Sequence, residues 1–181
     1  MIRVRPAAGA AEVAASGRVV QAAYAEFGPD SGNNSIPGWV AYRHEQGEAA
    51  ARARDALVLV AVDERDPGAQ VVGTATLYLA PTRDSEHWRD GDAVVRFLAV
   101  LPAARGRGVG KALLDACIRL ATEAGRPRLA LHTVAPMATA LGMYLRAGFV
   151  PDPAGDIDVD GFAIRAFALD LRAGGGARSP S

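Results

Sequence analysis

Apolar and polar residues alternate in two rhythms along the chain, and its first half predicts two helices and three strands. The stretch "IRVRP" at residues 2–6 alternates as a strand does and ends at a proline. Apolar residues recur at helical spacing from 10 to 27, and more loosely from 40 to 54. Two apolar runs, 57–62 and 71–79, flank the turn-rich "ERDPGA" and predict a β-hairpin.

The second half interleaves strands with helices. An apolar helical stripe follows the glycine-rich "ARGRGVGKALL" and ends near Gly125 and Pro127, and a shorter helix covers "MATALGMYLRAG" with Gly148 as its C-cap. Strands are expected over 93–102, 128–134 and 161–171, and turn-rich loops over 28–39, 81–92 and 148–158. With a hairpin at its centre, this order predicts a mixed α/β sheet rather than a purely parallel one.

Composition narrows the classes of protein. The chain has 181 residues and a formal net charge of zero, which suits one domain over 1–172 and gives no support to a general nucleic-acid binder. Residues 173–181 are rich in Gly and Ser, and we expect a disordered tail. Neither a signal peptide nor a membrane-spanning run is present, so the expected location is cytoplasmic, and the arginine and alanine bias indicates a bacterial source. The single cysteine, Cys117, is expected to be a buried thiol.

The segment "ARGRGVGKALL" at 104–114 joins a strand to a helix through a glycine-rich turn, an arrangement that binds phosphate groups. A nucleotide P-loop is excluded because Ala112 stands where Ser or Thr must follow the lysine, and Arg105 stands where the first glycine belongs. A dinucleotide fingerprint fails because the glycines at 106, 108 and 110 have the wrong spacing. The pattern R/Q-x-x-G-x-G/A fits at every position.

That pattern resembles the acetyl-CoA pyrophosphate loop of the GNAT superfamily of N-acetyltransferases. The flanking "RFLAVLP" is similar to the family's fourth strand, "RLALHT" to its fifth, and "MYLRAGF" to its Y-x-x-x-G-F segment. The resemblance extends more weakly over the whole chain. It implies a mixed, mostly antiparallel sheet of about six to seven strands, with helices on both faces and a splayed fourth and fifth strand.

The resemblance also implies a cofactor site for acetyl-CoA and no metal. The backbone of Leu98, Ala99 and Val100 matches the positions that pair with the pantetheine arm, and the Val100 N–H would polarise the thioester carbonyl. The pyrophosphate would bind the loop and the first turn of the helix, which are formed by Arg105, Gly106, Arg107, Gly108, Val109, Gly110 and Lys111. Lys111 is equally compatible with a solvated first-turn lysine. Asn is frequent in relatives where this chain has Met137, and that departure puts one pantetheine contact in doubt.

By the same resemblance, Tyr144 matches the general acid that protonates the departing CoA thiolate. The general base is open, because Val94 stands where many relatives carry a glutamate. Asp92 lies two residues earlier, on the same strand face if the strand extends that far. His132 on the next strand has a pKa range suited to proton transfer, although a structural role fits equally well, and His87 is a weaker candidate. Deprotonation through ordered water would need no single base.

The expected activity is direct acetyl transfer to a primary amine, whether a small molecule, a peptide N-terminus or a lysine, with a possible homodimer. Trp39 and Trp88 stand near two of the loops expected to surround the acceptor site. In the third loop, four aspartates form an acidic cluster that would attract a cationic amine: Asp152, Asp156, Asp158 and Asp160. The alternative is a non-catalytic acyl-CoA-binding module, which the absence of a carboxylate at Val94 favours.

Overall fold

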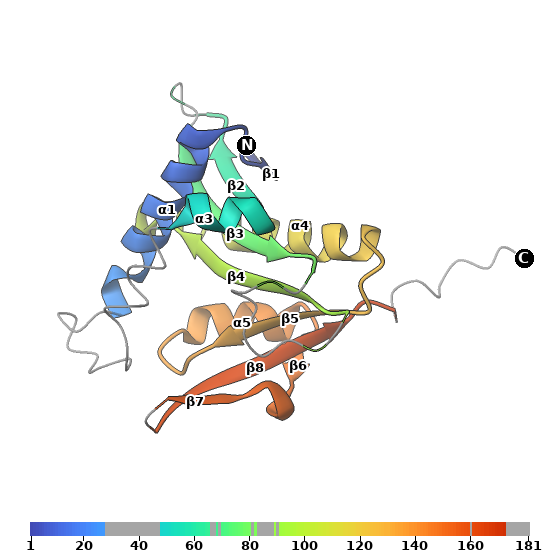
Figure 1. The fold of residues 1–181 in the computed structure, drawn as a ribbon. Coiled ribbons are helices and arrows are strands. Elements are labelled where there is room, and N and C mark those ends of the chain that lie inside the picture. The colour runs from blue at the N-terminus through green and yellow to red at the C-terminus, as the bar shows by residue number, and fades with distance from the viewer. Residues whose placement is uncertain are drawn as a thin grey trace, which may run out of the picture. The chain divides into compact units, whose positions relative to one another are not determined.

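The computed structural model describes residues 1–27, 48–65, 68, 70–80, 82, 89, 91–159 and 161–172 (Figure 1). Trp39, His87, Trp88 and Asp160, together with the expected tail, lie outside the described residues. The chain forms two compact units, and each is described by itself below. The first contains Met1–Leu77 and Arg96–Cys117, and the second contains Tyr78–Val95 and Ile118–Ser181.

The first unit contains the hairpin and the N-terminal helix that the sequence predicts. Its elements are β1 (Ile2–Pro6), α1 (Ala10–Tyr24), a 3-10 turn (Ala25–Phe27), α3 (Ala49–Asp55), β2 (Leu57–Asp63) and β3 (Val71–Tyr78), of which the last residue belongs to the second unit. β1 pairs antiparallel with β2, and β2 pairs antiparallel with β3. Only the last part of the helix expected over 40–54 is described, and it is helical.

β2 and β3 are buried along nearly their whole length, so both of their faces are covered. α1 and α3 pack against each other and against β2, as Figure 1 shows. The residues that begin α4 (Val109–Glu123) lie against β3, because a Cβ built on Gly73 would meet the side chains of Val109 and Leu113. Continuous apolar runs in the two strands thus correspond to helices on both faces of the sheet.

β4 (Ala93–Val100) and α4 run through both units. The second unit adds β5 (Arg128–Thr133), α5 (Ala138–Arg146), β6 (Val150–Pro151), a 3-10 turn (Pro153–Gly155), β7 (Ile157–Val159) and β8 (Phe162–Asp170). β8 is the centre of this unit, because β5, β6 and β7 all pair with it antiparallel (Figure 1). The segment 148–158, expected to be a loop, therefore contains two short strands.

The mixed sheet predicted from the sequence is confirmed. β4 pairs with β5 in parallel over three residues, from Ala93 to Val95, while the other registered pairs are antiparallel. No pair joins the remainder of β4 to β5, which agrees with a splayed strand pair. Within the described part of the chain, no helix is both long and apolar enough to cross a membrane.

Candidate active site

The glycine-rich loop follows a 3-10 turn (Pro102–Ala104) and leads directly into α4 at Val109. Gly106 and Gly108 have φ angles of 73° and 78°, in the left-handed region that favours glycine. A Cβ placed on either residue would meet no atom within 4 Å. These glycines are therefore required by the backbone conformation rather than by packing, and the space beside them is open.

The start of α4 presents backbone donors. The Ala112 N–H donates to the Gly108 carbonyl at 3.0 Å, which places Gly108 at the N-cap of the helix. The N–H groups of Val109, Gly110 and Lys111 precede that bond, so helix geometry provides them with no acceptor four residues back. Gly108 has no side chain to cap them. The first turn therefore combines exposed donors with the positive end of the helix dipole, which is an anion-binding arrangement.

The cationic side chains around this loop are already paired. Arg105 contacts Glu26 at 2.7 Å and donates to the Ala23 carbonyl at 3.2 Å, while Arg107 pairs with Asp63 at the end of β2. Arg107, and to a smaller extent Arg65, hold the pKa of Asp63 well below its usual range. The two loop arginines thus fasten the loop to α1, the following turn and β2. In α4, the exposed Lys111 pairs with Asp115, one helical turn on, at 2.6 Å.

The strand before the loop bends at Phe97. This residue has a φ of 53°, which is unusual for a bulky side chain, and it is 5% exposed. The Arg52 and Arg96 guanidinium groups lie 4.3 and 4.9 Å from the centre of its ring. The predicted pantetheine positions, Leu98 to Val100, come directly after this bend. Strain of this kind collects at functional sites, although its position alone assigns no function.

The second unit contains the three predicted catalytic residues. Tyr144 lies on α5, is 6% exposed, and its ring centre is 5.9 Å from that of Phe149. Asp92 and His132 line a pocket of about 270 Å³. Val94, at the position where the family often has glutamate, lines the same pocket, as do Arg128 and Gly155. Tyr144 is not among the lining residues.

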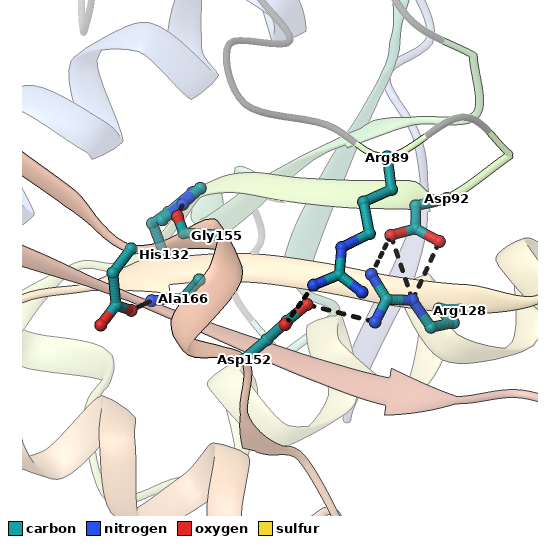
Figure 2. Close-up of polar contacts among 8 residues, drawn as sticks. Arg89, Asp92, Arg128, His132, Asp152, Gly155 and Ala166 are labelled. Carbon is teal, nitrogen blue, oxygen red and sulfur yellow. Dashed lines mark hydrogen bonds and ion pairs between the residues drawn. The ribbon is translucent and has the colours of Figure 1, made fainter.

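Arginine side chains dominate the charged wall of this pocket (Figure 2). Arg128 bridges two carboxylates: its Nη2 lies 2.5 Å from Asp92 Oδ2, and its Nη1 lies 3.1 Å from Asp152 Oδ2. Arg89 donates to the other oxygen of Asp152 at 2.7 Å. The Asp92 carboxylate raises the pKa of Arg128, so this guanidinium stays charged. Asp92 is therefore held in a buried ion pair with its oxygens engaged.

The acidic cluster expected to attract a cationic amine is largely neutralised. Asp152 is paired with two arginines, and Asp156 accepts from Arg165 at 2.6 Å and from the Ala166 N–H at 2.8 Å. Asp158 accepts from the Gly161 N–H at 2.7 Å. The sequence shows neighbouring aspartates but not the arginines opposite them. The idea of a free acidic patch is wrong for Asp152 and Asp156.

Sequence reasoning missed Arg89 and Arg128 altogether. Arg128 carries a usable signal, because Arg128, Ala130 and His132 alternate on one strand and must share a face. His132 Nε2 lies 2.8 Å from the Gly155 carbonyl oxygen (Figure 2). In summary of placement, the predicted cofactor residues belong to the first unit and the predicted catalytic residues to the second.

Comparison with known proteins assigns the family. The profile described as "Acetyltransferase (GNAT) family" matches residues 20–149. The chain belongs to the GNAT acetyltransferase family. This confirms the resemblance inferred from the glycine-rich loop. No curated protein matches the chain in sequence.

Solved structures show the same fold at low sequence identity. The ribosomal-protein-S18-alanine N-acetyltransferase of Escherichia coli is 18% identical, with a TM-score of 0.64 and 94% of each chain covered. The protein yncA of Salmonella typhimurium, solved with its cofactor acetyl-CoA, gives the same four values. The PaiA N-acetyltransferase of Thermoplasma acidophilum, in complex with coenzyme A, is 15% identical with a TM-score of 0.66, covering 92% of this chain and 98% of its own.

Proposed function

We propose that this protein transfers an acetyl group from acetyl-CoA to a primary amine. The observation that carries the proposal is the start of α4, where open space beside Gly106 and Gly108 adjoins the donors of Val109, Gly110 and Lys111. A pyrophosphate fits this site because it needs several donors and a close approach to the backbone. The family and its acetyl-CoA-bound and CoA-bound structural relatives support the same ligand.

The arginine pairs refine how the site would bind. Because Arg105 and Arg107 are fastened to Glu26 and Asp63, the phosphates would bind chiefly to backbone N–H groups. The pantetheine arm would follow the backbone of Leu98, Ala99 and Val100. The Val100 N–H would donate to the thioester oxygen and stabilise the negative charge that develops there.

The chemical step forms a C–N bond and breaks a C–S bond. The neutral amine attacks the thioester carbonyl carbon, and the tetrahedral intermediate collapses with CoA thiolate as the leaving group. We assign Tyr144 as the acid that donates its phenolic proton to that thiolate. The proton released from the attacking nitrogen goes to a base, so the protons balance once Tyr144 is reprotonated from solvent.

We place the base at His132 rather than at Asp92. The Asp92 carboxylate accepts hydrogen bonds from two nitrogens of Arg128 and is 4% exposed, so it is suited to anchoring a strand end. Val94 supplies no carboxylate. His132 lines the pocket and belongs to the residue type whose ordinary pKa lies nearest neutrality. Its role as base is the less secure part of the assignment in chemical terms, since ordered water would serve the same step.

Turnover separates this proposal from the non-catalytic alternative that Val94 favours. The measurement is CoA release from acetyl-CoA with a panel of small amines, amino acids and peptides that begin with alanine, the last chosen because a structural relative acetylates ribosomal protein S18 at alanine. We expect at least one acceptor to be acetylated. Acetyl-CoA binding without turnover on any acceptor class would support the binding module instead.

The Tyr144→Phe variant tests the acid. Phenylalanine keeps the ring packed beside Phe149 and removes only the hydroxyl group. We expect kcat to fall by about 10²–10⁴-fold, which is the usual contribution of a general acid, with an unchanged Kd for CoA. Wild-type turnover in this variant would remove Tyr144 from the mechanism.

A further inference from the structure

The segment from Asp152 to Asp156 crosses the pocket and is fastened at both of its ends. Asp152 is held by Arg128 and Arg89, and its own N–H donates to the Ala166 carbonyl at 2.9 Å. At the other end, the Asp156 carboxylate accepts from the Ala166 N–H and from Arg165. Both ends are therefore tied to the same point of β8, and little freedom remains for the 3-10 turn between them.

Gly155 lies at the closest approach of this segment to the sheet. A Cβ on Gly155 would lie 2.9 Å from the Ala166 Cβ, closer than real Cβ contacts come. Ala166 is also the residue of β8 that pairs directly with His132 of β5. Glycine thus lets the turn rest on this strand pair, which puts its carbonyl oxygen 2.8 Å from His132 Nε2.

The chemistry of this contact fixes the histidine tautomer. A backbone carbonyl oxygen can only accept a hydrogen bond, so the ring nitrogen facing it must carry a proton. In neutral His132 the proton is therefore on Nε2, and the basic lone pair is on Nδ1.

We infer that Gly155 and Arg128 are positioning residues that hold His132 in the Nε2–H tautomer with Nδ1 as its basic atom. Arg128 acts through Asp152, which it fastens at the start of the segment, and Gly155 acts through its carbonyl. The use of that basic atom in catalysis rests on the proposed function, whereas the tautomer itself does not.

Other charges surround the ring and enter any pH dependence. The charge of His132 contributes to the lowered pKa of Asp156, although the Ala166 N–H and Arg165 contribute more. Asp92, Asp152, Arg89 and Arg128 line the same pocket and form balanced pairs. Two carboxylates and two guanidiniums in close pairs leave a small net field on the ring, so the Gly155 contact is expected to determine which nitrogen is protonated.

The test is ¹⁵N NMR of the imidazole in the full-length protein, assigned by comparison with His132→Gln, together with the pH profile of kcat/KM. We expect wild type to show a protonated Nε2 and an unprotonated Nδ1 above the ring pKa. Gly155→Ala should mix the tautomers, shift the acid limb of the profile and lower kcat/KM by as much as about 100-fold, as misplacement by about 1 Å can do.

A rescue variant separates positioning from general damage. In Gly155→Ala/Ala166→Gly the clashing methyl is removed from the other side, so we expect the wild-type tautomer and profile to return. Asp152→Asn weakens the anchor without a clash and should produce a smaller change of the same kind, also when Gly155→Ala folds poorly.

Three results overturn the inference: a wild-type His132 protonated on Nδ1, a Gly155→Ala spectrum identical to wild type, or a double variant that is no closer to wild type than the single one. If no variant turns over any acceptor, the proposed function fails, and the NMR spectra still decide the tautomer.

Discussion

Gly73 connects the core of the first unit to the start of α4, and replacing it with alanine is the sharpest test of that packing. It lies in β3 beside a register shift between Ala61 and Val62 of β2. A Cβ at this position would be 2.7 Å from Val109 Cγ1, 3.0 Å from Leu113 Cδ1 and 3.2 Å from the Ala99 carbonyl oxygen. Val109 and Leu113 are at most 1% exposed, so neither side chain can move into solvent.

The magnitude follows from two opposing effects. Overpacking a well-filled core costs about 1–3 kcal/mol, and the lower entropy of an unfolded chain with alanine returns about 0.4–1 kcal/mol. We therefore expect Gly73→Ala to lower the free energy of unfolding by about 1–2 kcal/mol. For a chain of this size, that is a fall in Tm of about 2–8 °C. Because Val109 begins α4, the same displacement should also weaken CoA binding.

The assays are thermal unfolding and calorimetric titration with CoA. Gly142→Ala is the matched control, because it makes the same change inside α5 where a Cβ would meet only the flexible end of Arg146, at 3.3 Å. That control should gain about 0.5–1 kcal/mol. Adding Val109→Ala to Gly73→Ala should cost less than it does alone, since it removes the closest clash. A Gly73→Ala protein as stable as wild type, with unchanged CoA affinity, would refute the packing argument.

Three further outcomes are expected. Gly108→Ala forces alanine to a φ of 78° and should weaken CoA binding more than Arg107→Met does in the same titration, because the phosphates are expected to bind backbone groups. Arg5 and a backbone N–H lower the pKa of Glu12 to about 2, so its ionised form stabilises the fold above its ordinary pKa of about 4.5, and this stabilisation is lost as the pH falls towards 2. In urea titrations, Glu12→Gln should therefore differ from wild type at neutral pH, and the difference should shrink over that interval. Burial raises the pKa of the Cys117 thiol to about 12, so a thiol reagent should label the protein only when it is unfolded, and fast labelling of the folded chain would contradict this.

Local pattern was enough to predict most of the fold. β1, the β2–β3 hairpin, α4, α5 and β8 each carry a full apolar period, and chain-terminating residues such as Gly125 and Gly148 have the left-handed φ values expected of them. β6 and β7 were missed for a physical reason. They have two and three residues, too few to show an alternation, and they form because β8 offers its backbone groups on that side.

The glycine-rich loop could be predicted because its chemistry is contained in consecutive residues. The charged pocket could not, because its pairs join residues far apart in sequence: Arg128 with Asp92 across 36 positions, and Arg89 with Asp152 across 63. A charge seen in sequence has no visible partner. For this reason Asp152 looked available for an amine, and Asp92 looked available as a base, until the arginines opposite them were known.

The departure at Val94 gains its meaning from the same pairs. Asp92 is near the position of the missing carboxylate, yet Arg128 engages it and uses it to secure the start of β4 to the start of β5. Under the proposed function, a base is then needed elsewhere on that face, and His132 is the titratable side chain of the pocket that is not in an ion pair in the described contacts. The segment that orients its ring is anchored by that same Arg128. One arginine would thus remove a carboxylate from proton transfer and, through Asp152, position the imidazole that replaces it.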